Sequence, residues 1–106
     1  MAQYSFDQFV KDFPELSSKY LELVEAQRSL KGIDAKTRQL INIGIQTANG
    51  NLRGVKYHAF MAKKAGATRN EVLGAVVLNL HLRGVGVVLD TLPVAIAGFE
   101  SKKTDR

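Results

Sequence analysis

Hydrophobic residues recur along the chain at intervals of three and four positions, the spacing that places side chains on one face of a helix. Ser5 and Gln8 have the spacing of a capping box, which predicts a short amphipathic helix from Phe6 to Phe13. Pro14 suits the first turn of a second helix, because the N–H that proline lacks has no partner there. We expect one stripe of this second helix to be buried, formed by Leu16, Tyr20, Leu23 and Val24.

A third helix is predicted to begin near Ala35, after Asp34 as its cap, and to end at Asn49-Gly50. Its hydrophobic stripe contains small residues that would let another helix approach closely, and it comprises Leu40, Ile41, Gly44, Ile45 and Ala48. Three amide side chains lie away from this stripe or at its border: Gln39, Gln46 and Asn49. We interpret them as a solvated face, with the lining of a pocket as the alternative.

The fourth helix is predicted from about Leu52 to Ala65. One of its faces combines hydrophobic residues with a histidine, namely Val55, His58, Ala59, Ala62 and Ala65, so His58 should point inward. Inward histidines are more often core residues than catalysts. Gly66 suits the end of this helix, and Thr68 and Glu71 form a second capping box that fixes the start of the next.

The fifth helix, from this capping box to Leu82, has little polar surface, so it is predicted to be either central in the domain or part of an oligomer contact. His81 falls near its end, where capping or packing is favoured over catalysis. The glycines of Arg83-Gly84-Val85-Gly86 break the helix. They do not indicate a dinucleotide site, because they follow a helix rather than a strand and the third glycine is missing.

The last segment, from Val87 to Ala97, is predicted to be helical. Pro93 lies either in a first turn capped by Asp90 or at a kink. A buried strand is the alternative for this stretch, but no other segment would pair with it.

These elements predict an all-α single domain over residues 1–106, with a core of about residues 6–99 and a flexible tail at 100–106. The composition, 45% hydrophobic and 24% charged, is typical of a globular protein. The sequence contains no cysteine and no secretory signal pattern, so we expect a cytoplasmic protein without disulfides. The most hydrophobic region, Val72–Phe99, is interrupted by charged and histidine residues, which argues against a membrane span.

The formal net charge of +5 comes from scattered basic residues, and the usual nucleic-acid-binding motifs are missing. Nucleic acid is therefore not the expected partner. The two histidines stand 23 positions apart without a nearby carboxylate pattern, so no metal and no cofactor is expected. Asp34 and Asp90 are best explained as helix caps, since no serine in a nucleophile turn would join either of them in a catalytic triad.

Several segments occur in a recognisable order along the chain: Phe13-Pro14-Glu15-Leu16, Asp34-x-Lys36-Thr37-Arg38-x-Leu40-Ile41, Ala48-Asn49-Gly50, His58, and Ala65-Gly66-Ala67-Thr68-x-x-Glu71-Val72. Together with the order of the helices, they resemble the carboxymuconolactone decarboxylase and alkylhydroperoxidase D family over about residues 6–99. The joint spacing carries the resemblance, because no single segment is specific. It implies an all-α, six-helix domain of the alkylhydroperoxidase D type that assembles as a trimer or hexamer.

The peroxidase branch of that family carries a Cys-x-x-Cys pair at the start of the fourth helix, followed by a histidine and preceded by a glutamate. By the family's spacing, the cysteine positions fall on Asn51 and Gly54, the glutamate position on Gln39 and the histidine on His58. An amide and a glycine cannot cycle between thiol and disulfide, and Gln39 cannot carry a proton. Cysteine-based peroxidase activity is therefore excluded.

The decarboxylase branch also lacks the cysteine pair and keeps the histidine. The resemblance thus implies a non-redox enzyme, decarboxylase or lyase in type, acting on a small carboxylated or lactone substrate with His58 as acid and base. Arg53 and the first amides of the fourth helix would hold the carboxylate, and a small pocket would be lined by Gln39, Asn51 and Gly54. The alternatives are a non-catalytic oligomeric scaffold or small-molecule-binding protein, and a protein that binds anionic partners through its basic surface.

Overall fold

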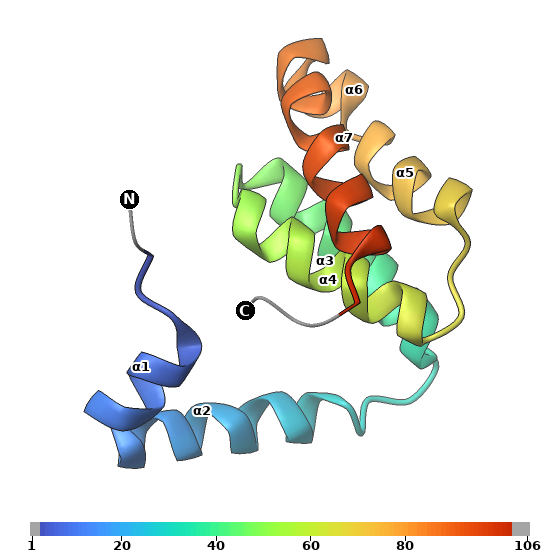
Figure 1. Cartoon of the computed structure of the whole chain (residues 1–106). Coiled ribbons are helices and arrows are strands. Elements are labelled where there is room, and N and C mark those ends of the chain that lie inside the picture. The colour runs from blue at the N-terminus through green and yellow to red at the C-terminus, as the bar shows by residue number, and fades with distance from the viewer. Residues whose placement is uncertain (1–2, 103–106) are drawn as a thin grey trace. The chain divides into compact units, whose positions relative to one another are not determined.

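Every regular element among residues 3–102, the part of the chain that the computed structural model describes, is a helix (Figure 1), which confirms the all-α prediction. The chain divides into two compact units at the Ile33–Asp34 junction. The first unit contains α1 (Phe6–Asp12) and α2 (Pro14–Gln27). The second contains α3 (Ala35–Ala48), α4 (Leu52–Lys64), α5 (Arg69–Val77), α6 (Leu80–Arg83) and α7 (Val85–Glu100).

The first unit begins with the predicted capping box. The Gln8 N–H donates to the Ser5 hydroxyl at 3.0 Å, and the Ser5 N–H donates to the Gln8 side chain at 2.9 Å. Pro14 is the first residue of α2, as expected, and the rings of Phe6 and Tyr20 lie 6.0 Å apart, which ties α1 to α2.

The prediction of a buried stripe on α2 is wrong. Leu16 is 59% exposed and Leu23 57% exposed, and the buried residue of the helix is Ser17, whose hydroxyl donates to the Pro14 carbonyl. The other helix of this unit, α1, is only seven residues long and is too short to cover the stripe. Helical periodicity predicts which side chains share a face but not whether a neighbour covers that face.

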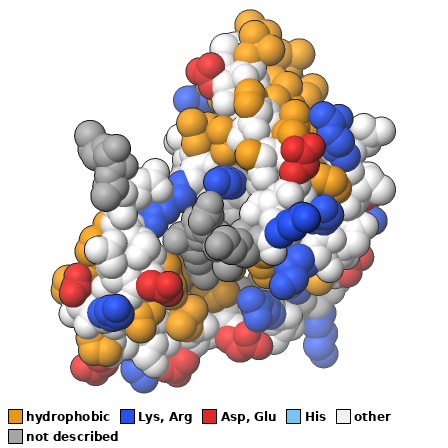
Figure 2. All heavy atoms as spheres, viewed as in Figure 1, with side chains coloured by type: hydrophobic (Ala, Val, Ile, Leu, Met, Phe, Trp, Pro, Cys, Tyr) orange, Lys and Arg blue, Asp and Glu red, His pale blue; other side chains and the backbone are white. Residues whose placement is uncertain are grey.

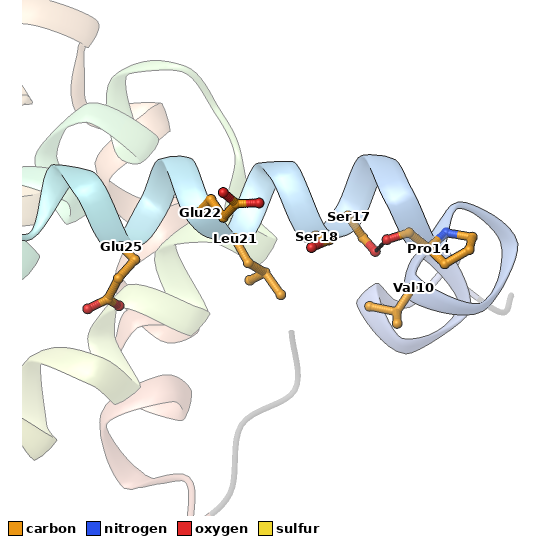
Figure 3. Close-up of a pocket in the computed structure, with 7 residues that line it drawn as sticks. All are labelled: Val10, Pro14, Ser17, Ser18, Leu21, Glu22 and Glu25. Atoms are coloured by element: carbon orange, nitrogen blue, oxygen red, sulfur yellow. Dashed lines mark hydrogen bonds between the residues drawn. The ribbon is translucent and has the colours of Figure 1, made fainter.

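An open groove of about 410 Å³ runs along α2 (Figure 3), and it is lined by Val10, Pro14, Ser17, Ser18, Leu21, Glu22 and Glu25. Its two carboxylates are paired with basic residues of the same helix, Glu22 with Lys19 at 3.4 Å and Glu25 with Arg28 at 2.9 Å. Hydrophobic and hydroxyl side chains make up the rest of the lining. The lining contains no histidine, cysteine or lysine that would activate a serine hydroxyl.

In the second unit, Asp34 caps α3 as predicted, accepting from the Thr37 N–H at 2.8 Å. Gly44 also has its predicted role, because a Cβ there would already lie 3.7 Å from the Ala75 carbonyl oxygen of α5.

The buried face of α3 differs from the predicted stripe. Ile41 and Ile45 are 46% and 52% exposed, whereas Ile43 and Thr47 are fully buried. The Thr47 hydroxyl donates to the Ile43 carbonyl at 2.8 Å, so its polar group is satisfied within the helix. A stripe drawn from hydrophobic residues alone leaves out this threonine.

In the core of the second unit α4 and α7 lie side by side (Figure 1), and Ile43 of α3 and Val72 and Val76 of α5 are buried with them. The buried residues of α4 are three of those predicted, Val55, Ala59 and Ala62, and those of α7 are Val88, Thr91, Ala95 and Gly98. A Cβ at Gly98 would overlap the Lys56 carbonyl group, whose carbon lies 2.9 Å from that position. The two backbones therefore pack in direct contact, and small side chains make this possible.

The Thr68–Glu71 capping box is confirmed, but the single long fifth helix is not. The chain turns after α5, and the shorter α6 follows. Asn79 is buried at this turn, where its side-chain amide donates to the Gly44 carbonyl at 3.3 Å. Asparagine competes with helical hydrogen bonding in this way, and the bond to α3 redirects the chain. Because Leu78 is 70% exposed, the end of the predicted fifth helix is not central in the domain.

The last segment is helical, as predicted, but it starts earlier than expected. Gly84, with φ +92°, ends α6, and its carbonyl accepts from the Val88 N–H as the first bond of α7. Asp90 and Pro93 therefore both lie inside α7, and the prediction that Asp90 caps a first turn containing Pro93 is wrong. Glu100, assigned to the tail, is the last residue of α7; of the rest of that predicted tail, residues 103–106 lie outside the described part of the chain.

Among residues 3–102, none of the helices combines the length and the hydrophobicity that crossing a membrane requires.

Candidate functional site

The candidate site is built on α3 and α4, which follow one another in the chain and pack together (Figure 1). Gly50, with φ +71°, makes the tight turn between them. Asn51 then caps α4, its side-chain oxygen accepting from the Gly54 N–H at 2.9 Å. The predicted pair of Asn51 and Gly54 is thus in contact, and it fixes the start of α4 one turn before His58.

His58 is half-buried and is held by α3. Its Nδ1 lies 2.8 Å from the side-chain oxygen of Gln39. Since an amide oxygen can only accept a hydrogen bond, this contact requires the proton to be on Nδ1. The adjacent Tyr57 ring meets the imidazole edge-on at 5.2 Å and 74°. These two contacts give the imidazole a defined orientation, with Nδ1 bonded to Gln39.

A second amide of α3 also faces α4. Gln46 is half-buried, and its side-chain Cδ lies 2.7 Å from where a Cβ of Gly54 would stand. Gln39 and Gln46 are seven residues apart, about two helical turns, and so lie on the same side of α3. The interpretation of these two amides as a solvated face is therefore wrong. It holds for Asn49, which is exposed at the end of α3.

The other predicted site residues are compared with His58 by their angle around the axis of α4. Gly54 precedes His58 by four residues, so only about 40° separates them around α4. Arg53 precedes it by five, about 140° around the axis, and is exposed in the first turn of α4. His81 is exposed on α6. His58 therefore shares its face of α4 with Gly54. A role for Arg53 stays a prediction.

The Lys-Thr-Arg segment has a structural role in part. Lys36 Nζ lies 3.1 Å from a carboxylate oxygen of Glu71, which joins the start of α3 to the start of α5. The pKa of Glu71 is lowered by the Thr68 backbone hydrogen bond and, next, by the bond from Lys36. The pKa of Asp34 is lowered in the same way by the Thr37 backbone N–H. These carboxylates are capping groups rather than proton donors at neutral pH, and the pairing of α3 with α5 had no signal in the sequence.

Within the described range, no group of three or more histidine, cysteine, aspartate or glutamate side chains could hold a metal ion. The site consists of one histidine with amides around it. Such a set can orient a neutral imidazole, donate hydrogen bonds to a carboxylate and move a proton.

A model of the carboxymuconolactone decarboxylase family matches residues 14–97, which include α2 to α6 and most of α7. The chain belongs to the carboxymuconolactone decarboxylase family. Comparisons with curated proteins and with solved structures gave no match. The match confirms the resemblance drawn from the motif spacing and leaves α1 outside. A family member without cysteine cannot use thiol chemistry of its own.

Proposed function

We propose that this carboxymuconolactone decarboxylase family member is a non-redox lyase, acting on a small carboxylated or lactone substrate with His58 as acid and base. One observation carries the proposal, the 2.8 Å bond between Nδ1 of His58 and the oxygen of Gln39. It fixes the tautomer and directs acid–base chemistry to Nε2.

The proposed reaction is the loss of CO₂ from a lactone that carries a carboxylate. The bond between the carboxylate carbon and the ring breaks, and its electron pair stays on the ring carbon, delocalised toward the lactone carbonyl. That carbon then takes a proton from Nε2 of protonated His58, which is later reprotonated by water. Gln39 keeps accepting from Nδ1–H throughout, so the ring does not rotate during the transfer.

The carboxylate that leaves as CO₂ has to be held beforehand. In the proposal, Arg53 and the first N–H groups of α4 take this role, because an N-terminal helix end favours an anion. The Gly54 N–H is donated to the Asn51 side chain, so it takes no part in holding the carboxylate.

The experiment is to incubate the purified protein with carboxymuconolactone and follow CO₂ release. We expect turnover by the wild-type protein, and a loss of at least a hundredfold in His58→Gln, because general acid catalysis contributes about 10²–10⁴. His81→Gln is the matched control and should keep full activity, because His81 is exposed on α6. Equal rates in the wild-type protein and His58→Gln would refute the assignment of His58.

The second candidate function is a non-catalytic oligomeric scaffold, and it has its own supporting observation. Hydrophobic side chains gather where α5 ends, along α6 and over the first turns of α7 (Figure 2), and several of them are largely exposed: Leu78 (70%), Leu82 (68%), Leu89 (61%) and Val85 (59%). We name these four residues the tip patch. Contiguous exposed hydrophobic surface of this kind is typical of interfaces.

In this reading the tip patch packs against other copies of the chain, in a trimer or hexamer. Assembly and catalysis are compatible, so turnover decides between the two functions. A protein that assembles but gives no CO₂ release from any small carboxylated lactone would favour the scaffold, and CO₂ release that depends on His58 would favour the lyase.

A further inference from the structure

The side chain of Gln46 packs against α4 at Gly54. Its Cδ, Cγ and Nε2 lie at 2.7, 3.0 and 3.0 Å from where a Cβ of Gly54 would stand. These distances are shorter than those a real Cβ makes, so the amide occupies the space that any side chain at position 54 would need. Glycine at position 54 leaves this space open, and a Cβ there would push the flexible end of Gln46 aside.

The side-chain amide of Gln46 makes no hydrogen bond with any residue in the range 3–102, and the residue is half-buried. Gln39, on the same side of α3, spends its oxygen on His58. The nitrogen and oxygen of this amide are not among the buried unpartnered atoms, so they are open to solvent. The amide can therefore donate to a ligand.

The position of Gln46 relative to His58 suits a ligand that spans both. Gly54 and His58 are one turn apart on the same face of α4, which separates their Cβ positions by about 5–6 Å. Side chains on a helix lean toward its N-terminus, so the imidazole leans toward the turn of Gly54 and Gln46.

Resting on the proposed function, we propose that Gln46 is a specificity-determining binding residue of the His58 site. Its amide N–H group donates to the carboxylate of a small cyclic acid whose ring reaches His58. Gly54 is the residue that permits this placement. Gln46 thereby selects acids over the corresponding neutral esters.

The test uses two probes, 5-oxotetrahydrofuran-2-carboxylate and its neutral methyl ester, with binding followed by NMR at the His58 imidazole. The readout is the ratio of the ester and acid dissociation constants. We expect the wild-type protein to prefer the acid. Gln46→Met keeps the packing on Gly54 but lacks the donor, and it should lower the preference by about tenfold or more, the loss expected for one hydrogen bond to a charged group.

Two further variants keep the test decisive if Gln46→Met folds poorly. Gln46→Glu retains the size of the side chain and should reverse the preference toward the ester, because it places a like charge beside the carboxylate. Gly54→Ala should displace Gln46 and lower the preference as Gln46→Met does. Asn70→Ala, an exposed change on α5, is the control and should leave the preference unchanged.

The outcomes separate this inference from the proposed function. If the acid binds beside His58 and the Gln46 variants keep the wild-type preference, the role of Gln46 is refuted and that of His58 stands. If the acid does not perturb His58 in the wild-type protein, both are refuted. A preference that falls in Gln46→Met, Gln46→Glu and Gly54→Ala but not in Asn70→Ala supports the role of Gln46.

Discussion

Replacing Gln39 with glutamate puts a negative charge against the imidazole of His58 with almost no change in shape. In the wild-type protein the two side chains are 2.8 Å apart, so the new carboxylate oxygen would stand against Nδ1. A neutral amide can fix the tautomer but does little to stabilise the imidazolium ion. A carboxylate does both, so Gln39→Glu should raise the pKa of His58.

The size of this increase follows from the contact distance. With 2.8 Å between the heavy atoms, the delocalised charges would be centred about 4 Å apart, and their attraction lies between about 1 kcal/mol in water and about 4 kcal/mol near a protein surface. Each pKa unit corresponds to about 1.36 kcal/mol. Partial burial of the new carboxylate opposes the gain, so we expect an increase of about 1–2 units.

The assay is a pH titration of the imidazole Cε1–H resonances by NMR in the wild-type protein and in Gln39→Glu. The resonance of the exposed His81 in the same spectra is the internal control, because the substitution does not touch that residue. An unchanged or lowered pKa of His58 in Gln39→Glu would show that the two side chains are not in contact in solution. The hydrogen bond that carries the proposed function would then be absent.

Three further predictions test the surrounding structure. Gly98→Ala should lower the free energy of unfolding in urea by about 1–3 kcal/mol or more, because a new Cβ would meet the α4 backbone, whereas Gly74→Ala, with open space around it, should raise it by about 0.5–1 kcal/mol. The pKa of Glu71 is lowered in the folded protein, so the stability that its carboxylate contributes is present above the ordinary glutamate pKa of about 4.3 and is lost as pH falls through the folded value. The free energy of unfolding should therefore fall less steeply with acid in Glu71→Gln than in the wild-type protein. An identical slope would contradict this. Leu78→Glu with Leu82→Glu should reduce the mass measured by light scattering to that of smaller assemblies, and an unchanged mass would exclude the tip patch as an interface.

Local signals in the sequence were sufficient for the helix starts. The capping boxes at Ser5 and Thr68 and the aspartate cap at Asp34 lie where the residue types predict them, because each is an interaction within four residues. The start of α7 was missed because Gly84 ends one helix and begins the next, whereas Asp90 has the residue type of a cap without the position.

Features that depend on packing between helices were predicted less well. Thr47 is buried because its hydroxyl bonds within α3, and Leu16 is exposed because no helix of its unit is long enough to cover it. Both outcomes depend on neighbours that periodicity cannot identify. The break at Asn79 belongs to the same class, because the bond to Gly44 that causes it spans 35 positions.

For the candidate site, the sequence located His58, Gln39, Asn51 and Gly54 through the family spacing, and the structure shows His58 in contact with Gln39 and Asn51 with Gly54. Gln46 was noticed only as one of several amides. A signal was available, since it follows Gln39 by seven positions, and so lies two turns along the same side of the helix, and glycine stands at position 54. Only the three-dimensional structure shows that the end of Gln46 occupies the space that a side chain at position 54 would need.

The most direct test of the central claim is the tautomer of His58, read from the ¹⁵N chemical shifts of its two ring nitrogens at a pH where the ring is neutral. The account predicts a protonated Nδ1 and an unprotonated Nε2, with a change in the Nε2 shift when carboxymuconolactone is added. A protonated Nε2 in the free protein, or an imidazole whose Nε2 shift does not respond to the lactone, would contradict it.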